Sequence, residues 1–196
     1  CIGAGVSHHE IESDGLVSEH APALAQAAAV IGDVQVRNRG TMGGSIAHAD
    51  PAADYPGALL ALDAIIEIVG PGGASQIPAA EFFIDLFFTA LSPGDIITGV
   101  TIPASPEGSV SCYYKFPQPA SRFAVCGCAV WMVREGVACK DARVAFNGVG
   151  NTAFRDEGVE QTIIGKELTP ENISSASARA ADGVDVMEDV FAGEAY

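Results

Sequence analysis

Basic side chains are scarce in this sequence. Only 10 lysines and arginines stand against 25 aspartates and glutamates, which gives a formal net charge of −15. A surface so rich in carboxylates repels the phosphate backbone of nucleic acids. We therefore exclude nucleic acid as a partner. Arg37 and Arg39 form one of the few locally basic spots, and they lie beside a glycine-rich stretch.

The cysteines lack the spacing of a metal site. One close pair, Cys126 and Cys128, lies in an apolar run, and on a strand both thiols would share a face. We expect no zinc or iron–sulfur site. We interpret all five as buried free thiols of a reducing cytosol: Cys1, Cys112, Cys126, Cys128 and Cys139.

Long apolar runs are also missing. No stretch approaches the length that crosses a bilayer, and no charged segment precedes an apolar one as in a signal peptide. We therefore expect no membrane insertion and a cytoplasmic location.

Apolar residues, at 48%, are nevertheless plentiful enough for a globular core. In the first half, their spacing and the glycine and proline positions predict alternating elements. The expected helices span 21–32, 50–62 and 81–87, and the expected strands span 64–69, 74–78 and 95–103.

The pattern changes after residues 104–110, which we interpret as a linker. Three consecutive strands are predicted there, followed by two helices: 111–116, 123–133 and 137–149, then 155–164 and 169–183. Such an order is typical of an α+β layer domain, here a three-stranded antiparallel sheet packed on helices.

The glycine-rich stretch "GTMGGS", residues 40–45, is the main candidate for chemistry. It lacks the lysine of a Walker loop and the spacing of a Rossmann loop. Adjacent glycines allow close approach of a ligand and can turn consecutive N–H groups into an anion-binding nest, to which Thr41 and Ser45 would add hydroxyls. The alternative is an ordinary turn between a strand and a helix, and the loop alone favours that turn.

The surrounding sequence resembles a known family. "VQVRNRGTMGGSIAHADPAADYPGALLALDA" (34–64) resembles the second flavin-binding segment of the FAD subunit of molybdenum hydroxylases, the family of the carbon monoxide dehydrogenase medium subunit and the xanthine dehydrogenase flavin domain. "IGAGVSHHEI" (2–11) and "FFTALSPGDIITGVTIP" (87–103) extend the resemblance. "YYKFPQPASRFAVCGCAVWM" (113–132) and "ARVAFNGVG" (142–150) are similar to the C-terminal domain of that subunit.

The resemblance implies an α+β fold in two domains. Residues 1–103 would be the later part of an FAD-binding domain, 104–110 the linker, and 111–196 a domain like the carbon monoxide dehydrogenase flavoprotein C-terminal domain. The family's first subdomain, with a first glycine loop, and a final helix after "FAGEAY" have no counterpart in these residues. We therefore expect this chain alone to bind FAD weakly or not at all.

The resemblance also implies a cofactor site. Main-chain N–H groups of one loop would wrap the FAD pyrophosphate: Thr41, Met42, Gly43, Gly44 and Ser45. Valine at Gly43 or Gly44 would abolish FAD retention and leave the fold intact. Asp54 would hold the adenosine or ribitol side, with a helix-cap role equally open, whereas Asp50 is interpreted as a cap.

Residues around the flavin ring follow from the same resemblance. Ile96 and Ile97 would contact the ring, with core packing favoured for Ile96. Lys115 would lie near the pyrimidine edge, where a cation stabilises developing negative charge, unless it is a solvated strand residue. Phe123 would lie near the ring or in the core.

The histidines receive minor roles. His48 would make a local hydrogen bond, since the family binds FAD non-covalently. His8 and His9 are interpreted as surface residues, because no acidic or cysteine partner lies at ligand spacing.

The function implied is electron transfer. FAD on this chain would accept electrons from [2Fe–2S] clusters of a small subunit and pass them to an external acceptor. A large subunit would carry the molybdenum cofactor, in a dimer of heterotrimers. The alternative is an assembly module that docks on these subunits without a working flavin site. A stand-alone flavoenzyme is less favoured, because no acid–base constellation is present.

Overall fold

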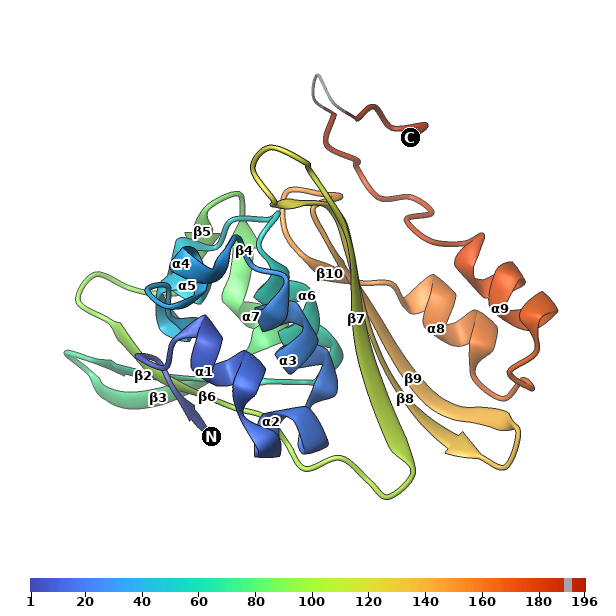
Figure 1. The fold of residues 1–196 in the computed structure, drawn as a ribbon, viewed down its shortest axis with the longest axis horizontal. Helices are drawn as coiled ribbons and strands as arrows, with labels where there is room; N and C mark the ends of the chain where they lie inside the picture. The colour runs from blue at the N-terminus through green and yellow to red at the C-terminus, as the bar shows by residue number, and fades with distance from the viewer. Residues whose placement is uncertain (189–191) are drawn as a thin grey trace.

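The computed structural model describes residues 1–188 and 192–196. Its elements form layers (Figure 1): a four-stranded sheet, a group of helices, a second four-stranded sheet, and two further helices. The α+β class predicted from the sequence is confirmed.

The first sheet is antiparallel throughout, with the strand order β1-β6-β2-β3. Its strands are β1 (Ile2–Gly3), β2 (Ile65–Gly70), β3 (Gly73–Pro78) and β6 (Ile96–Thr101). The three strands predicted in this half are confirmed, with ends that differ by up to two residues. β1 is at the edge of the sheet, so the chain starts beside β6 rather than beside its neighbours in sequence.

Helices cover the region between the sheets. They are α1 (His8–Ser13), α2 (Gly15–His20), α3 (Pro22–Ala29), α4 (Val34–Arg37), α5 (Met42–His48), α6 (Asp54–Ala61) and α7 (Ala79–Phe82). Helices α1, α2, α4 and α5 were not predicted, because each is too short to show a helical apolar period. Side-chain caps define their starts instead, at Ser7, Asp14, Asp33 and Thr41.

Helix α6 is buried on every side and packs against α3 and the second sheet. The prediction that this helix begins at Asp50 is wrong. The Asp50 carboxylate accepts the N–H of Ala52 at 2.9 Å and closes a turn ahead of the helix, which starts four residues later. Asp50 therefore caps a turn and not a helix.

The predicted aromatic helix over 81–87 is also wrong. The helix ends at Phe82, and the chain continues as a two-stranded hairpin, β4 (Phe83–Asp85) and β5 (Phe88–Thr89). Phe87, at the turn, has φ +54°. Successive aromatic residues favour extended backbone, and here that preference prevails.

The second sheet has the order β10-β9-β8-β7. Its strands are β7 (Ser109–Pro117), β8 (Ala124–Glu135), β9 (Ala138–Asn147) and β10 (Phe154–Arg155). The three long strands are confirmed, whereas the short β10 makes four strands rather than the predicted three. Residues 104–108 carry no helix or strand, and Ser109 and Val110 already belong to β7.

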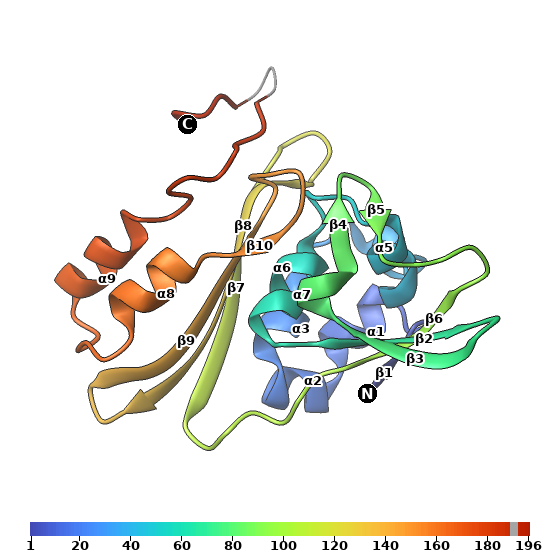
Figure 2. The ribbon, with the colours of Figure 1, turned by 180° about the vertical axis from the view of Figure 1, so that it is seen from behind.

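Helices α3 and α6 pack on one face of this sheet, and α8 (Glu157–Ile163) packs on the other with α9 (Pro170–Ser177) beside it (Figure 2). Gly165, with φ +80°, follows the end of α8 as expected. The last helix was predicted to extend to 183. In the structure it ends at Ser177, and a series of turns follows.

The cysteines are free, as predicted, but they are not all buried. Cys139 is buried, whereas Cys1 and Cys112 are exposed. Burial raises the pKa of the half-buried Cys128 to about 12. In the described part of the chain, no group of histidine, cysteine and acidic side chains is placed to hold a metal ion, and no helix has the length and apolar character to cross a membrane.

Candidate functional site

The glycine loop forms the start of α5. Thr41 is the N-cap, and its hydroxyl accepts the N–H of Gly44 at 3.2 Å. Gly43 donates its N–H to the carbonyl of Ala4 at 2.8 Å, and Met42 donates to Val6 at 3.0 Å. The predicted row of free N–H groups is therefore not present, because the segment after β1 supplies carbonyls to this turn.

The two adjacent glycines have different environments. Gly43 is buried, and a Cβ there would lie 2.6 Å from the Cβ of Ala4. We therefore expect Gly43→Val to disturb the fold, contrary to the expectation from the sequence. Gly44 is exposed, and among the described residues a Cβ there would approach only the Thr41 hydroxyl, at 3.0 Å. Packing thus requires glycine at position 43 but not at 44.

Asp54 and Lys115 form a buried ion pair. The Nζ of Lys115 lies 2.8 Å from Oδ2 of Asp54, and the two side chains are 3% and 5% exposed. Asp54 is the first residue of α6 but makes no capping bond, and Lys115 lies near the end of β7. Both alternative interpretations, a helix cap and a solvated lysine, are wrong. The structure brings together two candidates 61 residues apart in sequence.

Burial has the largest effect on Asp54. It raises the pKa of this carboxyl above its ordinary value, although Lys115 and the Tyr113 hydroxyl act in the opposite direction. Removing a carboxylate from water thus costs more than the neighbouring cation returns. The ion pair therefore fixes the position of β7 relative to α6 and adds little net stability.

The pair joins the two halves of the chain. Lys115 also donates to the carbonyl of Val30 at 2.9 Å, and Arg122 donates to Gly32 at 3.2 Å. Both carbonyls lie just beyond α3, at the end of the helix that attracts cations. β7 and the loop that follows it are therefore held against the C-terminal end of α3.

Two further polar residues complete this cluster, and sequence reasoning missed both. The Tyr113 hydroxyl donates to Oδ1 of Asp54 at 2.7 Å and lies 3.2 Å from Oδ1 of Asn147. Asn147 is fully buried, and its Nδ2 has no partner among the described residues. Gly57 and Gly127 give the amide its space, since a Cβ at either would collide with it. Gly57 is on helix α6 and Gly127 is on strand β8, and a single sequence does not reveal that both face Asn147.

His8 is buried, so the surface interpretation of this residue is wrong. Its Nδ1 lies 2.9 Å from the Tyr55 hydroxyl, and its Nε2 would lie 2.5 Å from a Cβ at Gly40. His9, the neighbour, is exposed as predicted and pairs with Glu12 at 2.8 Å. His8 therefore connects the glycine loop to α6, one residue from Asp54.

The His8 contact predicts a pH dependence. Burial and then the charge of Arg37 lower the pKa of His8, so the folded chain binds this proton less readily than the unfolded chain does. Stability should fall as the pH drops below the ordinary histidine pKa of about 6.5. Urea unfolding at neutral and mildly acidic pH measures this. His8→Gln should reduce the change in the free energy of unfolding between these pH values, whereas His9→Gln should not. An equal change in both variants would contradict this prediction.

The remaining candidates take separate positions. Ile97 is 7% exposed and belongs to the core, whereas Ile96 is 67% exposed, so the core role favoured for Ile96 is wrong. Phe123 is half-exposed beside Arg122. The His48 ring lies 5.1 Å from that of Phe87, so a ring contact takes the place of the expected hydrogen bond. Phe123 therefore offers a ring to a ligand, and Ile97 does not offer a free surface.

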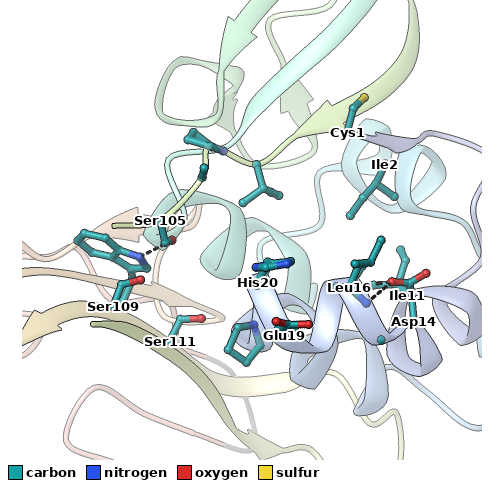
Figure 3. Close-up of a pocket in the computed structure, with 18 of the residues that line it drawn as sticks. Cys1, Ile2, Ile11, Asp14, Leu16, Glu19, His20, Ser105, Ser109 and Ser111 are labelled. Atoms are coloured by element: carbon teal, nitrogen blue, oxygen red, sulfur yellow. Dashed lines mark hydrogen bonds between the residues drawn. The ribbon is translucent and has the colours of Figure 1, made fainter. Parts of the chain in front are cut away.

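A groove in the described part of the chain lies elsewhere. It is bounded by β1, α1, α2 and residues 102–111 (Figure 3), and none of the nine candidate residues lines it. Its ionisable residues include Glu10, Asp14, Glu19 and Glu107. An acidic groove repels a pyrophosphate, so this groove is distinct from the candidate site.

Comparison with known proteins identifies two families along the chain. Residues 1–105 match the FAD binding domain in molybdopterin dehydrogenase, and residues 111–196 match the CO dehydrogenase flavoprotein C-terminal domain. The carbon monoxide dehydrogenase medium chain of Hydrogenophaga pseudoflava is 35% identical over 96% of this chain and 66% of its own length. Subunit alpha of the 6-hydroxypseudooxynicotine dehydrogenase complex of Paenarthrobacter nicotinovorans is 35% identical over 100% of this chain and 66% of its own length.

Solved structures agree with this match. Carbon monoxide dehydrogenase from Hydrogenophaga pseudoflava, in a form lacking the Mo-pyranopterin moiety, superposes with a TM-score of 0.91 at 34% identity, over 97% of this chain and 66% of that one. Quinoline 2-oxidoreductase from Pseudomonas putida 86 superposes with a TM-score of 0.90 at 27% identity, over 98% of this chain and 67% of that one.

The chain spans about two thirds of the length of these relatives. The resemblance predicted from the glycine loop and its flanks is confirmed along the whole chain. The chain belongs to the family of FAD-binding domains of molybdopterin dehydrogenases, joined to a CO dehydrogenase flavoprotein C-terminal domain.

Proposed function

We propose that this chain binds FAD non-covalently and serves as the electron-transfer unit of a molybdenum hydroxylase. When bound, FAD would supply two-electron redox chemistry between [2Fe–2S] clusters of a partner subunit and an external acceptor. No side chain of this chain need act as a general acid or base. Its residues would bind and orient the cofactor.

Gly44 is the observation that carries this proposal. It occupies the third position of α5, three residues after the Thr41 cap. The equivalent position of α1 holds Glu10, which completes a capping box with Ser7. Glycine in a helix costs about 1 kcal/mol relative to alanine, and among the described residues a Cβ here would approach only the Thr41 hydroxyl, at 3.0 Å. We infer that this open face accommodates a group from outside the chain.

The residues around this face fit an anion. The first turn of α5 has the positive end of the helix dipole, and Thr41 and Ser45 bring hydroxyls. The Gly44 N–H, in a long and exposed cap bond, is the donor most accessible to a pyrophosphate oxygen. Met42 and Gly43, whose N–H groups are already bonded, would position this turn against β1.

Asp54 and Lys115 have a different role in this proposal from the one implied by the resemblance. Because they neutralise each other, Lys115 would bring little net positive charge to a flavin. We propose that the pair orients β7 and the loop with Phe123 relative to α3. The half-exposed Phe123 ring would then face the cofactor, whereas the buried Ile97 would pack in the core beneath the first sheet.

The relatives support a multi-subunit assembly. They are described as medium chains or as subunits of dehydrogenase complexes. We propose a large partner subunit with the molybdenum cofactor and a small one with [2Fe–2S] clusters, in a dimer of heterotrimers. The substrate would be selected on the large subunit.

One observation favours the alternative of an assembly module without a flavin. The N–H groups of residues 42–45 are all bonded within the chain, which leaves fewer donors for a phosphate than a nest would offer.

Co-expression with molybdenum and iron–sulfur subunits separates the two functions. The purified complex should show the visible absorbance of oxidised flavin in proportion to this chain. Loss of that absorbance after Gly44→Glu, with all subunits still present, would place the flavin at this loop. A complex that assembles without any flavin would support the assembly module instead.

A further inference from the structure

His8 is not among the residues proposed to contact FAD, yet it lies against the loop that would do so. Its backbone N–H donates to the Gly40 carbonyl at 3.0 Å. The chain just before it continues this pairing, because Met42 donates its N–H to the Val6 carbonyl at 3.0 Å. The segment that ends at His8 therefore holds the start of the glycine loop in place.

The His8 ring fills the space between this loop and helix α6. Its Nδ1 lies 2.9 Å from the Tyr55 hydroxyl, and the two rings meet edge to face with their centroids 5.2 Å apart. On the loop side, a Cβ at Gly40 would lie 2.5 Å from the ring Nε2. The residue is only 4% exposed, so the loop and the helix enclose the ring. Glycine at position 40 thus makes room for this histidine.

Helix α6 provides a fixed reference for the loop. Tyr55 is fully buried at its second position, and Asp54, at its first, forms the buried ion pair with Lys115. Two adjacent residues of one helix therefore connect to both regions proposed to contact FAD, the glycine loop through His8 and strand β7 through Lys115. The relative position of these regions depends on both contacts.

The elements around His8 carry several titratable groups. They are His9, Glu10 and Glu12 on α1, Glu19 and His20 on α2, Arg37 on α4, Arg39 in the loop, and Asp54 and Tyr55 on α6, whereas α3 carries none. Two of these carboxylates are already paired, Glu12 with Arg37 and Asp54 with Lys115. Burial and then the charge of Arg37 lower the pKa of His8. A proton on this ring would therefore add a second cation to an enclosed place.

We propose that His8 is a positioning residue for FAD: its neutral ring holds the glycine loop against α6, and its protonation releases the loop. This inference rests on the proposed function, because it concerns the control of the same loop. The neutral ring fits between the Tyr55 hydroxyl and the Gly40 backbone. A charged ring would need water or a counter-ion, for which this enclosed position leaves no room. Ring and loop would then separate, and FAD affinity should fall in acid.

The first experiment needs no cofactor. In the isotope-labelled chain, the ring signals of His8 give its protonation midpoint, and hydrogen exchange gives the protection of the Met42 and Gly43 amides. We expect this protection, relative to an unstructured peptide, to fall by up to about tenfold per pH unit below the midpoint. The amide of the fully buried Ala145, in β9, should keep its protection. Constant protection of the loop amides through the His8 midpoint would overturn the proposal.

The second experiment follows the amides of Thr41 and Gly44 during FAD titrations at each pH. FAD affinity should fall with the His8 midpoint, by up to about tenfold per pH unit. Affinity that rises in acid would indicate a phosphate in contact with the charged ring and would overturn a positioning role. FAD that shifts neither amide at any pH would contradict the proposed function itself. Hydrogen exchange alone would then decide whether His8 holds the loop.

Substitutions separate the contact of His8 from its charge. His8→Asn can keep a hydrogen bond to the Tyr55 hydroxyl but cannot titrate, so it should retain loop protection at neutral pH and lose the pH dependence. His8→Leu should lower the protection at every pH, whereas His9→Asn, at the exposed neighbour, should change neither property. Tyr55→Phe removes only the hydroxyl and should lower the protection while the pH dependence remains. Full pH dependence in His8→Asn, or unchanged protection in Tyr55→Phe, would overturn the proposal.

Discussion

Asp54→Asn should lower the free energy of unfolding by about 3–5 kcal/mol, because it leaves the Lys115 ammonium buried without its counter-ion. Asparagine keeps an oxygen for the Tyr113 hydroxyl and changes the volume little, so the loss reports the charge. Lys115→Met should cost a similar amount, since the Asp54 carboxylate would then be buried and unpaired. Urea unfolding followed by circular dichroism measures both.

The double variant Asp54→Asn, Lys115→Met sharpens this prediction. Because burial already disfavours the charged carboxyl, removing both charges should cost clearly less than the sum of the single losses. Asp182→Asn is the matched control, since Asp182 pairs with Arg179 in water and should change stability by less than about 1 kcal/mol. If the losses of stability from Asp54→Asn and Lys115→Met were additive, the two side chains would not form a buried ion pair. The same would follow if Asp54→Asn cost as little stability as the Asp182→Asn control.

The long strands of the second sheet were predictable from the sequence because each alternates and is bounded by clear turns. Gly136 and the turn at 136–137 are an example, since the hairpin of β8 and β9 depends on local residues alone. The shorter helices were not predictable in this way. Their positions depend on single caps, such as Asp33 at α4, and on packing, of α1 and α2 against α3 and of α4 against α1.

The candidate site was likewise predictable only in part. The glycine loop, Asp54 and Lys115 could be named from the sequence, but their contacts could not. Lys115 meets a carboxylate from a helix 61 residues away, and no local pattern records that distance. Tyr113 and Asn147 were missed because an aromatic strand residue and an asparagine before a turn have ordinary interpretations in sequence.

The two glycines give the most specific lesson. Sequence treats Gly43 and Gly44 alike, whereas the structure assigns the first to packing against Ala4 and the second to an open face. Only Gly44 is therefore suitable for testing the cofactor site by substitution. Valine and glycine differ by less than about 0.5 kcal/mol in helix propensity, so Gly44→Val should keep the fold.

An FAD titration of the isotope-labelled chain, followed by amide NMR, tests the central claim most directly. Because shift changes report weak binding, the method does not require a tight complex. We expect FAD to shift the amides of Thr41, Gly44 and Ser45 at the start of α5, and to leave those of Leu16 and Glu19 in the groove unchanged. In Gly44→Val, with the remaining spectrum preserved, the loop shifts should disappear. Shifts confined to other surfaces, or loop shifts that survive Gly44→Val, would contradict the assignment of this loop to FAD.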